Sequence, residues 1–460
     1  MKINSWAKIY IFEFLALLAI YIFSLTDPYF PFWIILGSVI AATLLKKWVS
    51  EIIIAGSTLA ILLQHYFGVA VKYDSATSIV TSYSSIQLKV LSFIAFLTIC
   101  YLIKRIFSKL KSSYATSVFL FLIPLLSVLL YKAFNFMLLA NLLAVNIWNF
   151  FIYYRSVEPL ENNNWQIKLK TLLSSIPPVW TRATETRELL DYNLYSSRSA
   201  DELMNCIQSG CWMIFRGIVT IVILKEIDSA ALFYYSELME LSATRFTSLH
   251  RIIPLIFSNY ESVPAYHLWI LIYFSGIKFL FESYYGFLSV SVGIARLLGL
   301  NLTSSTNRPW NASNFPDFCG RFMYYYAFIL SNYFYLPLQK SLGRMNISTK
   351  TRRRVCLFAA ITFGGMYFHI LKNFSEHLSR DSFLISISSY SLPALYYFSA
   401  FAFFCSFIVF ERRNSKLRLI KAGYFLFYLG LYSILFSGQF LSPVIGKGHL
   451  MGFFLRLFGI

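Results

Sequence analysis

Apolar runs follow one another along almost the whole chain, and short polar or basic stretches separate them. Most runs are close to the ~20 residues that a helix needs to cross a bilayer. Because some runs are short or amphipathic, we expect about eleven crossings, in an all-α polytopic membrane protein. The helices are expected over residues 8–24, 29–46, 51–70, 86–104, 116–132, 135–154, 206–225, 265–281, 284–300, 322–338, 355–372, 390–410 and 421–440.

The composition agrees with this pattern. The chain is 57% hydrophobic and 13% charged, whereas a soluble domain has about 25% charged residues. The net charge of +19 comes mostly from short blocks between apolar runs, such as residues 46–47, 104–111 and 349–354. This distribution is typical of cytoplasmic loops and excludes a nucleic-acid partner, which would require one basic domain. The same distribution of basic residues predicts a cytoplasmic N-terminus. We also expect the first apolar run to be kept as a transmembrane helix rather than removed as a signal peptide.

The segment Glu282 to Leu338 combines a helix with an unusual loop. Its helical part is rich in small residues, which allow close helix contact, and it is expected to end with a C-cap at Gly299. The polar stretch "NLTSSTNRPWNASNFPDF" follows, between two hydrophobic segments. Non-helical backbone at membrane depth is tolerated where it is buried in protein or lines a wet cavity. The loop, with Pro309, Trp310 and Asn311, is therefore a candidate wall of a site.

Several short motifs occur in a fixed order along the chain. They are "GCWMIFRGIVTIVIL" at 210–224, "VGIARLLGL" at 292–300, "TNRPWNASNFPDF" at 306–318, "SNYFYLPL" at 331–338 and "GGMYFH" at 364–369. In this order they resemble the membrane-bound O-acyltransferases. Within that family the likeness is to the bacterial branch of alginate O-acetyltransferase and the D-alanyl transfer protein of teichoic acids. The resemblance covers about residues 210 to 370.

The resemblance implies a fold with a central tunnel and an acyl transfer across the membrane. A thioester, acyl-CoA or acyl carrier protein, would donate a short acyl group from the cytoplasmic side to a hydroxyl of an envelope glycan or a lipid-linked acceptor. It implies His369 as the general base, with Arg296, Asn307, Arg321 and Asn332 binding substrate or donor. Together with the apolar runs, it divides the chain into N-terminal transmembrane helices at 1–155, a polar, cytoplasmic interfacial segment at 156–205, a catalytic core at 206–380 and C-terminal transmembrane helices at 381–460.

His369 lies 15 residues after Arg354, which is about 22 Å along a straight helix. That distance lies well inside a hydrocarbon layer of ~30 Å, where a neutral imidazole can act as a base. The alternative is that the imidazole only hydrogen-bonds a neighbouring helix. The other histidines carry no motif, and we expect structural or exposed roles for them.

Two departures from the family pattern bear on activity. Met323 stands where the family has a histidine, in the stretch "FCGRFM". The motif "GGMYFH" has one residue more before its histidine than the family's G-G-L-W-H. On a regular helix, an added residue rotates the histidine by about 100° unless a local bulge absorbs it.

Two other hypotheses remain open. The chain could be a scaffold or partner-binding protein that keeps the fold without the transfer, or a transporter or flippase of a lipid-linked substrate. The six cysteines show no CxxC spacing, and no motif for a bound cofactor or metal is present. We expect a bacterial inner-membrane protein, with an exported or membrane partner to complete the transfer.

Lys278 and Glu282, four residues apart, are expected to neutralise each other.

Overall fold

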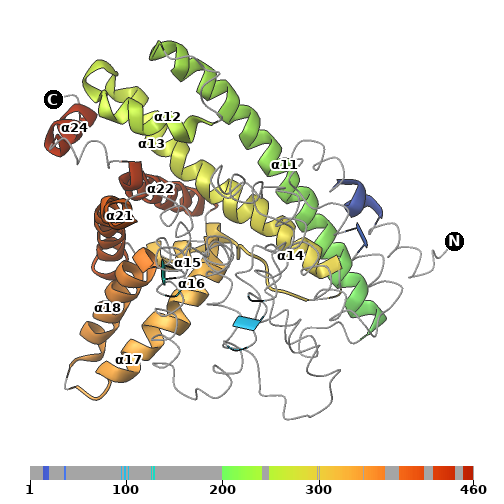
Figure 1. Cartoon of the computed structure of the whole chain (residues 1–460). Coiled ribbons are helices and arrows are strands. Elements are labelled where there is room, and N and C mark those ends of the chain that lie inside the picture. The colour runs from blue at the N-terminus through green and yellow to red at the C-terminus, as the bar shows by residue number, and fades with distance from the viewer. Residues whose placement is uncertain are drawn as a thin grey trace. The chain divides into compact units, whose positions relative to one another are not determined.

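A computed structural model of the chain shows helices throughout the part that it describes (Figure 1). No strand occurs among these residues, so the all-α fold class is confirmed for this part of the chain. The number of crossings and the tunnel stay predictions. The residues described are 14–19, 36–37, 95, 98–99, 102, 126, 128–129, 199–240, 248–297, 299, 301–345, 347–367, 383–408, 418–440 and 449–458.

Helix α11 (Ala200–Leu238) is much longer than the crossing expected over 206–225 (Figure 1, green). It begins with a reciprocal cap, in which the Glu202 amide donates to Ser199 Oγ and the Ser199 amide donates to the Glu202 carboxylate, both at 3.2 Å. The predicted end at residue 225 was wrong, because the charged residues that follow are compatible with a helix. Within the described residues, only Asp201–Leu238 is long and apolar enough to cross a membrane, which supports membrane association.

Contacts divide the chain into two compact units. The first comprises Met1–Phe215, Leu288–Thr303 and Phe368–Ile387, and the second comprises Arg216–Phe287, Ser304–Tyr367 and Ser388–Ile460. The predicted division at residues 155, 205 and 380 stays a prediction.

In the first unit, the beginning of α11 crosses α14 (Leu288–Leu297) at two glycines. A Cβ atom on Gly210 would lie 2.8 Å from the Gly293 carbonyl oxygen, and one on Gly293 would lie 2.7 Å from the Gly210 carbonyl oxygen. The two backbones therefore touch, as the small residues of this segment predicted. Gly299 has φ of 85°, a left-handed conformation that confirms its expected place just after the helix.

In the second unit, α13 packs along α22. A Cβ atom on Gly276 of α13 would lie 2.5 Å from the Cα atom of Ser433 in α22, so close packing depends on this glycine. Aromatic rings fill the core, including those of Phe318, Phe322 and Tyr432. The helices of this unit include α12 (Leu249–Ser258), α13 (Ala265–Phe279), α15 (Phe315–Phe322), α16 (Tyr324–Leu330), α17 (Leu336–Leu342), α18 (Thr349–Ala359), α22 (Arg418–Ser437) and α24 (Leu450–Leu457), with most of α21 (Phe383–Ser406).

Three helical stretches of the described residues have the wider π-helical turn: η6 (Leu280–Phe287), η8 (Ser331–Tyr335) and η9 (Ala360–Gly364). Each lies within or beside an apolar run that was expected to form a regular helix. The stretch η6 joins α13 to α14, η8 joins α16 to α17, and η9 follows α18. Wide turns of this kind are rare in proteins overall, and those that occur are often found at functional sites.

Candidate functional site

The polar loop before α15 is held at both of its sides. Ser305 is buried, and its Oγ donates to the Tyr284 carbonyl in η6 at 2.9 Å. The Asn307 amide donates to the Arg321 carbonyl at 2.7 Å, and the Tyr324 amide donates to the Ser305 carbonyl at 3.3 Å. These bonds fix the loop between η6 and the end of α15, and its role as the wall of a site stays a prediction.

The middle of this loop is a single tight turn, η7 (Pro309–Asn311), which packs against α22. Arg308 before it has φ of 45°, an uncommon conformation for a residue with a side chain. The Asn311 amide donates to the Arg308 carbonyl at 2.9 Å. Pro309 is buried, whereas 47% of Trp310 is exposed, so the turn presents one large aromatic side chain at its surface.

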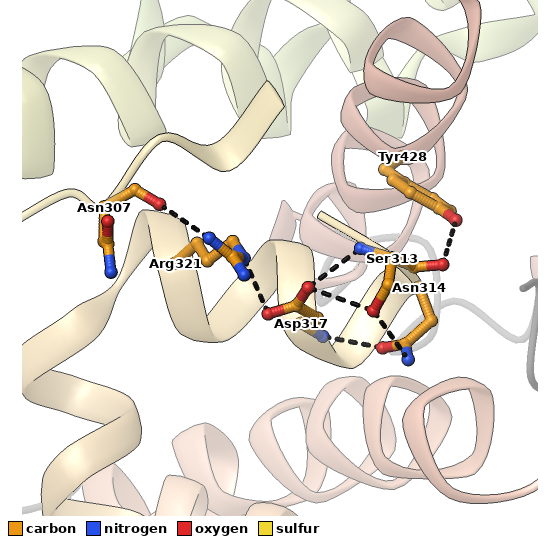
Figure 2. Close-up of polar contacts among 6 residues, drawn as sticks. All are labelled: Asn307, Ser313, Asn314, Asp317, Arg321 and Tyr428. Atoms are coloured by element: carbon orange, nitrogen blue, oxygen red, sulfur yellow. Dashed lines mark hydrogen bonds and ion pairs between the residues drawn. The ribbon is translucent and has the colours of Figure 1, made fainter. Parts of the chain in front are cut away.

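A polar network around Asp317 links the loop to α15 (Figure 2). Asn314 caps the helix, since its Oδ1 accepts from the Asp317 amide at 2.9 Å. The Asp317 carboxylate accepts from the Ser313 amide at 2.8 Å and from Arg321 Nε at 2.7 Å. Arg321 also reaches the Asn307 carbonyl through Nη1 at 3.4 Å. Asn307 and Arg321, two of the predicted donor-binding residues, are thus brought together.

Arg321 keeps an accessible part. Its side chain is 33% exposed, and that of Asp317 is 28% exposed. The Asp317 contact uses Nε, and the longer contact uses Nη1, so the guanidinium has further N–H groups for an anion such as a phosphate. This geometry suits the role predicted for Arg321.

Met323 lies at the junction of α15 and α16, and its side chain is buried. Its Sδ accepts from the Tyr432 hydroxyl at 4.0 Å. Nearby Cys319 is also buried. Met323 is therefore a packed thioether without acid–base function.

Asn332 lies in η8, where its Nδ2 donates to the Phe328 carbonyl at 2.8 Å. The stretch η8 packs against η9, and neighbouring atoms come close at Gly364, the last residue of η9, and at Gly365 after it. A Cβ atom on Gly364 would lie 2.9 Å from Phe334 Cγ, and one on Gly365 would lie 3.0 Å from the Tyr326 hydroxyl. The "GG" of the motif therefore fits a crowded helix contact. His369 itself lies outside the described residues, which in this stretch end at Tyr367.

Arg296 lies in the first unit, and its guanidinium donates hydrogen bonds to neighbouring groups of that unit. Its Nε donates to the Leu302 carbonyl at 2.8 Å, Nη2 donates to the same oxygen, and Nη1 donates to Ser209 Oγ at 2.5 Å. Its own carbonyl accepts from the Cys206 thiol at 3.5 Å. These contacts tie α14 to α11 and to the chain that follows, so Arg296 has an evident structural function.

A second group of charged residues lies in the second unit, at one cleft of about 240 Å³. Lys278 Nζ is 2.9 Å from Asp228 Oδ1 and 3.6 Å from Glu282 Oε2. The sequence pointed to Lys278 and Glu282 through their spacing, but it did not single out Asp228, which is the nearer partner and is buried. In the sequence, the one feature that could have pointed to Asp228 as a site residue is its position just after an apolar run. The cleft is lined by Asp228, Ser248, Leu249, Ile253, Phe274, Ser275, Lys278, Phe279, Glu282 and Ser283.

His267 of α13 is buried between two tyrosines of α11. Its Nε2 lies 3.5 Å from the Tyr234 hydroxyl, and its Nδ1 lies 3.4 Å from the Tyr235 hydroxyl. Both ring nitrogens thus have partners, which fits a structural histidine. Across the residues described, no three His, Cys, Asp or Glu side chains are grouped so that they could hold a metal ion. In comparisons with known proteins, the chain matches no family model and no curated protein sequence.

Proposed function

We propose that the protein is a membrane O-acyltransferase of the membrane-bound O-acyltransferase type. It would move a short acyl group, as in O-acetylation, from a thioester donor to a hydroxyl of an envelope glycan or a lipid-linked acceptor. The ordered motifs between residues 210 and 370 are the ground for this proposal. About eleven crossings, a cytoplasmic N-terminus and a bacterial inner-membrane location belong to the same proposal.

The observation that carries the proposal is the position of η9. This π-helical stretch ends at Gly364, where the "GGMYFH" motif begins. A π-type hydrogen bond closes a turn with one residue more than an α-type bond. A bulge of this kind can offset the rotation of about 100° that one added residue would otherwise impose. The extra residue before His369 is thus compatible with the family's register, and this supports His369 as the active histidine.

In the proposed reaction, the acceptor hydroxyl gives its proton to the imidazole of His369 as its oxygen attacks the thioester carbonyl. The tetrahedral intermediate then collapses, the C–S bond breaks, and the leaving thiolate takes the proton from the imidazolium. Arg321, supported by Asp317 and the Asn307 carbonyl, would hold a phosphate of acyl-CoA or of a phosphopantetheine arm. No bound cofactor is required. An exported or membrane partner would complete delivery to the acceptor.

The test is an acyl transfer assay in membranes, with a radiolabelled thioester donor and envelope acceptor. His369→Ala should abolish transfer, because no other base is proposed. Insertion of one alanine between Met366 and Tyr367, beyond the wide turn, should turn His369 by about 100° and abolish transfer as well. Deletion of Phe363, an exposed residue of η9, should instead close the wide turn to a regular helix and retain transfer. Phe363→Ala is the matched control and should retain activity. Transfer by His369→Ala at the wild-type rate would refute the proposal.

Met323 favours one alternative, a scaffold that keeps the fold without the transfer. Its buried thioether fills the position of a family histidine. If wild-type membranes show no transfer with either donor class, Met323→His is the informative variant. A gain of transfer in that variant would identify the natural chain as an inactive member of this fold.

A further inference from the structure

The hairpin of α17 and α18 carries a concentrated positive charge. Four of its cations, Lys340, Arg344, Lys350 and Arg353, are exposed, and Arg352 and Arg354 are half-buried. The sequence contains no acidic residue between Asp317 and Glu376, so nothing close along the chain can neutralise them. The ion pairs found in the described part of the chain all lie elsewhere.

The beginning of α18 adds to this positive potential. Ser348 caps the helix by accepting from the Thr351 amide at 3.2 Å, and the first turn holds no acidic residue. Instead, Lys350 and Arg352 to Arg354 crowd the first two turns. The N-terminus of a helix carries a partial positive charge, so cations there are unfavourable and anions are favourable. The start of the helix and the cations together form a surface suited to phosphate groups.

The tip of the hairpin also exposes apolar side chains. Met345 is 56% exposed and Ile347 is 38% exposed, and they lie between Arg344 and Lys350. A soluble polyanion would leave these two side chains in water. A membrane surface can use both kinds of group, because the cations meet headgroup phosphates while the apolar side chains enter the boundary of the acyl chains.

We propose that this hairpin, residues 340–354, docks on anionic phospholipid headgroups of the cytoplasmic leaflet. Clusters of four to eight Lys and Arg residues beside a membrane helix bind such headgroups. The apolar run expected over 355–372 starts directly after Arg354, so docking would anchor the helix that leads to η9 and the "GGMYFH" motif. The proposal rests on the membrane location proposed above but not on acyl transfer, so it can fail or succeed independently of activity.

The test uses the full-length protein in nanodiscs of phosphatidylcholine alone, or of phosphatidylcholine with an equal part of phosphatidylglycerol. Hydrogen exchange of residues 340–350 should be slower in the anionic discs. The triple variant Arg344→Gln, Lys350→Gln, Arg353→Gln should lose this protection. Each cation near an anionic surface contributes about fivefold in affinity, so the preference for phosphatidylglycerol over phosphatidylcholine, counted by native mass spectrometry, should fall by up to about 100-fold.

The matched control is Arg412→Gln, Arg413→Gln, Lys416→Gln, which removes the same charge from another predicted cytoplasmic block. It should keep the protection at 340–350. Met345→Ser with Ile347→Ser should reduce the protection while leaving the charge unchanged. Equal exchange in both kinds of disc would overturn the proposal. So would an equal loss in the control, or protection that arises only when an acidic protein is added to phosphatidylcholine discs.

Discussion

Arg296 and Arg321 were expected to share one role, yet the two regions that hold them use an arginine differently. In the first unit, the Arg296 guanidinium donates hydrogen bonds to the Leu302 carbonyl and to Ser209 Oγ. These bonds lie beside the contact in which the backbones of α11 and α14 meet at two glycines. In the second unit, Arg321 pairs with Asp317 at the surface and keeps accessible N–H groups. Of the two, Arg321 has the geometry to bind an anion.

The two arginines differ because Arg296 donates to a buried backbone carbonyl, whereas Arg321 pairs with a partly exposed carboxylate. A buried carbonyl such as that of Leu302, left without a partner, costs more free energy than a partly exposed ion pair contributes, since water replaces the partner in the second case. The region of Arg296 should therefore be sensitive in stability and insensitive in substrate binding. The region of Arg321 should show the reverse.

The largest effect on stability is expected from Gly293→Ala. Its new methyl group would lie 2.6 Å from Ile214 Cγ1 and 2.7 Å from the Gly210 carbonyl oxygen, so the α11–α14 crossing must shift. We expect a loss of about 1–3 kcal/mol in the free energy of unfolding. The measurement is denaturant unfolding of the purified protein in detergent. Gly423→Ala in α22 is the control, because nothing lies within 4 Å of its new Cβ atom, and it should be neutral or slightly stabilising.

Arg296→Met should come next, with a loss of about 1–2 kcal/mol in the free energy of unfolding, because the Leu302 carbonyl loses both of its arginine donors. Arg296→Lys should recover only part of it, since an ammonium cannot reproduce the fork of the guanidinium. The KM for the acyl donor should not change in the folded fraction. If Arg296→Met raised the KM for the donor and left the free energy of unfolding unchanged, Arg296 would bind the donor, and the difference drawn between it and Arg321 would be wrong.

Asn314→Ala removes the cap of α15 and should cost about 1 kcal/mol in the free energy of unfolding. Asn314→Ser keeps an oxygen that can accept from the Asp317 amide, so it should restore most of the loss. Because the cap positions Asp317 and through it Arg321, the alanine variant should also raise the KM for the donor. Thermal unfolding and transfer kinetics on the same preparations would check both effects.

Arg321→Gln should have the smallest effect on stability, about 0.5 kcal/mol, because its ion pair is partly exposed. In contrast to Arg296→Met, it should raise the KM for the donor without lowering the amount of folded protein. Arg321→Lys keeps the charge and is the matched control, with a smaller rise. An unchanged KM in Arg321→Gln would leave Arg321 with a structural role only.

The sequence predicted helices where the apolar runs are long, and those over 265–281, 390–410 and 421–440 correspond to α13, α21 and α22, with α21 beginning earlier, at Phe383. It missed the extension of α11, because a charge such as Asp228 marks the end of an apolar run unless its partner is known. That partner, Lys278, is distant in sequence. Hydropathy carries no information on such pairs.

The site was predictable in part for similar reasons. The sequence singled out the loop from its polarity and its proline, and its role as the wall of a site stays a prediction. The partners of Arg296 and Arg321 could not be found, because hydrogen bonds depend on which backbone carbonyl comes near. The π-helical turn at Ala360–Gly364 had one signal, the additional residue in "GGMYFH".

That turn also has a consequence for comparing sequences. A wide turn lets a membrane helix gain a residue during evolution while the segments on either side keep their neighbours. Two related helices that differ by one residue should then be aligned with the gap inside the turn. For this chain, an alignment with a helix that is one residue shorter should therefore place the gap within residues 360–364, so that residues 365–369 stay uninterrupted.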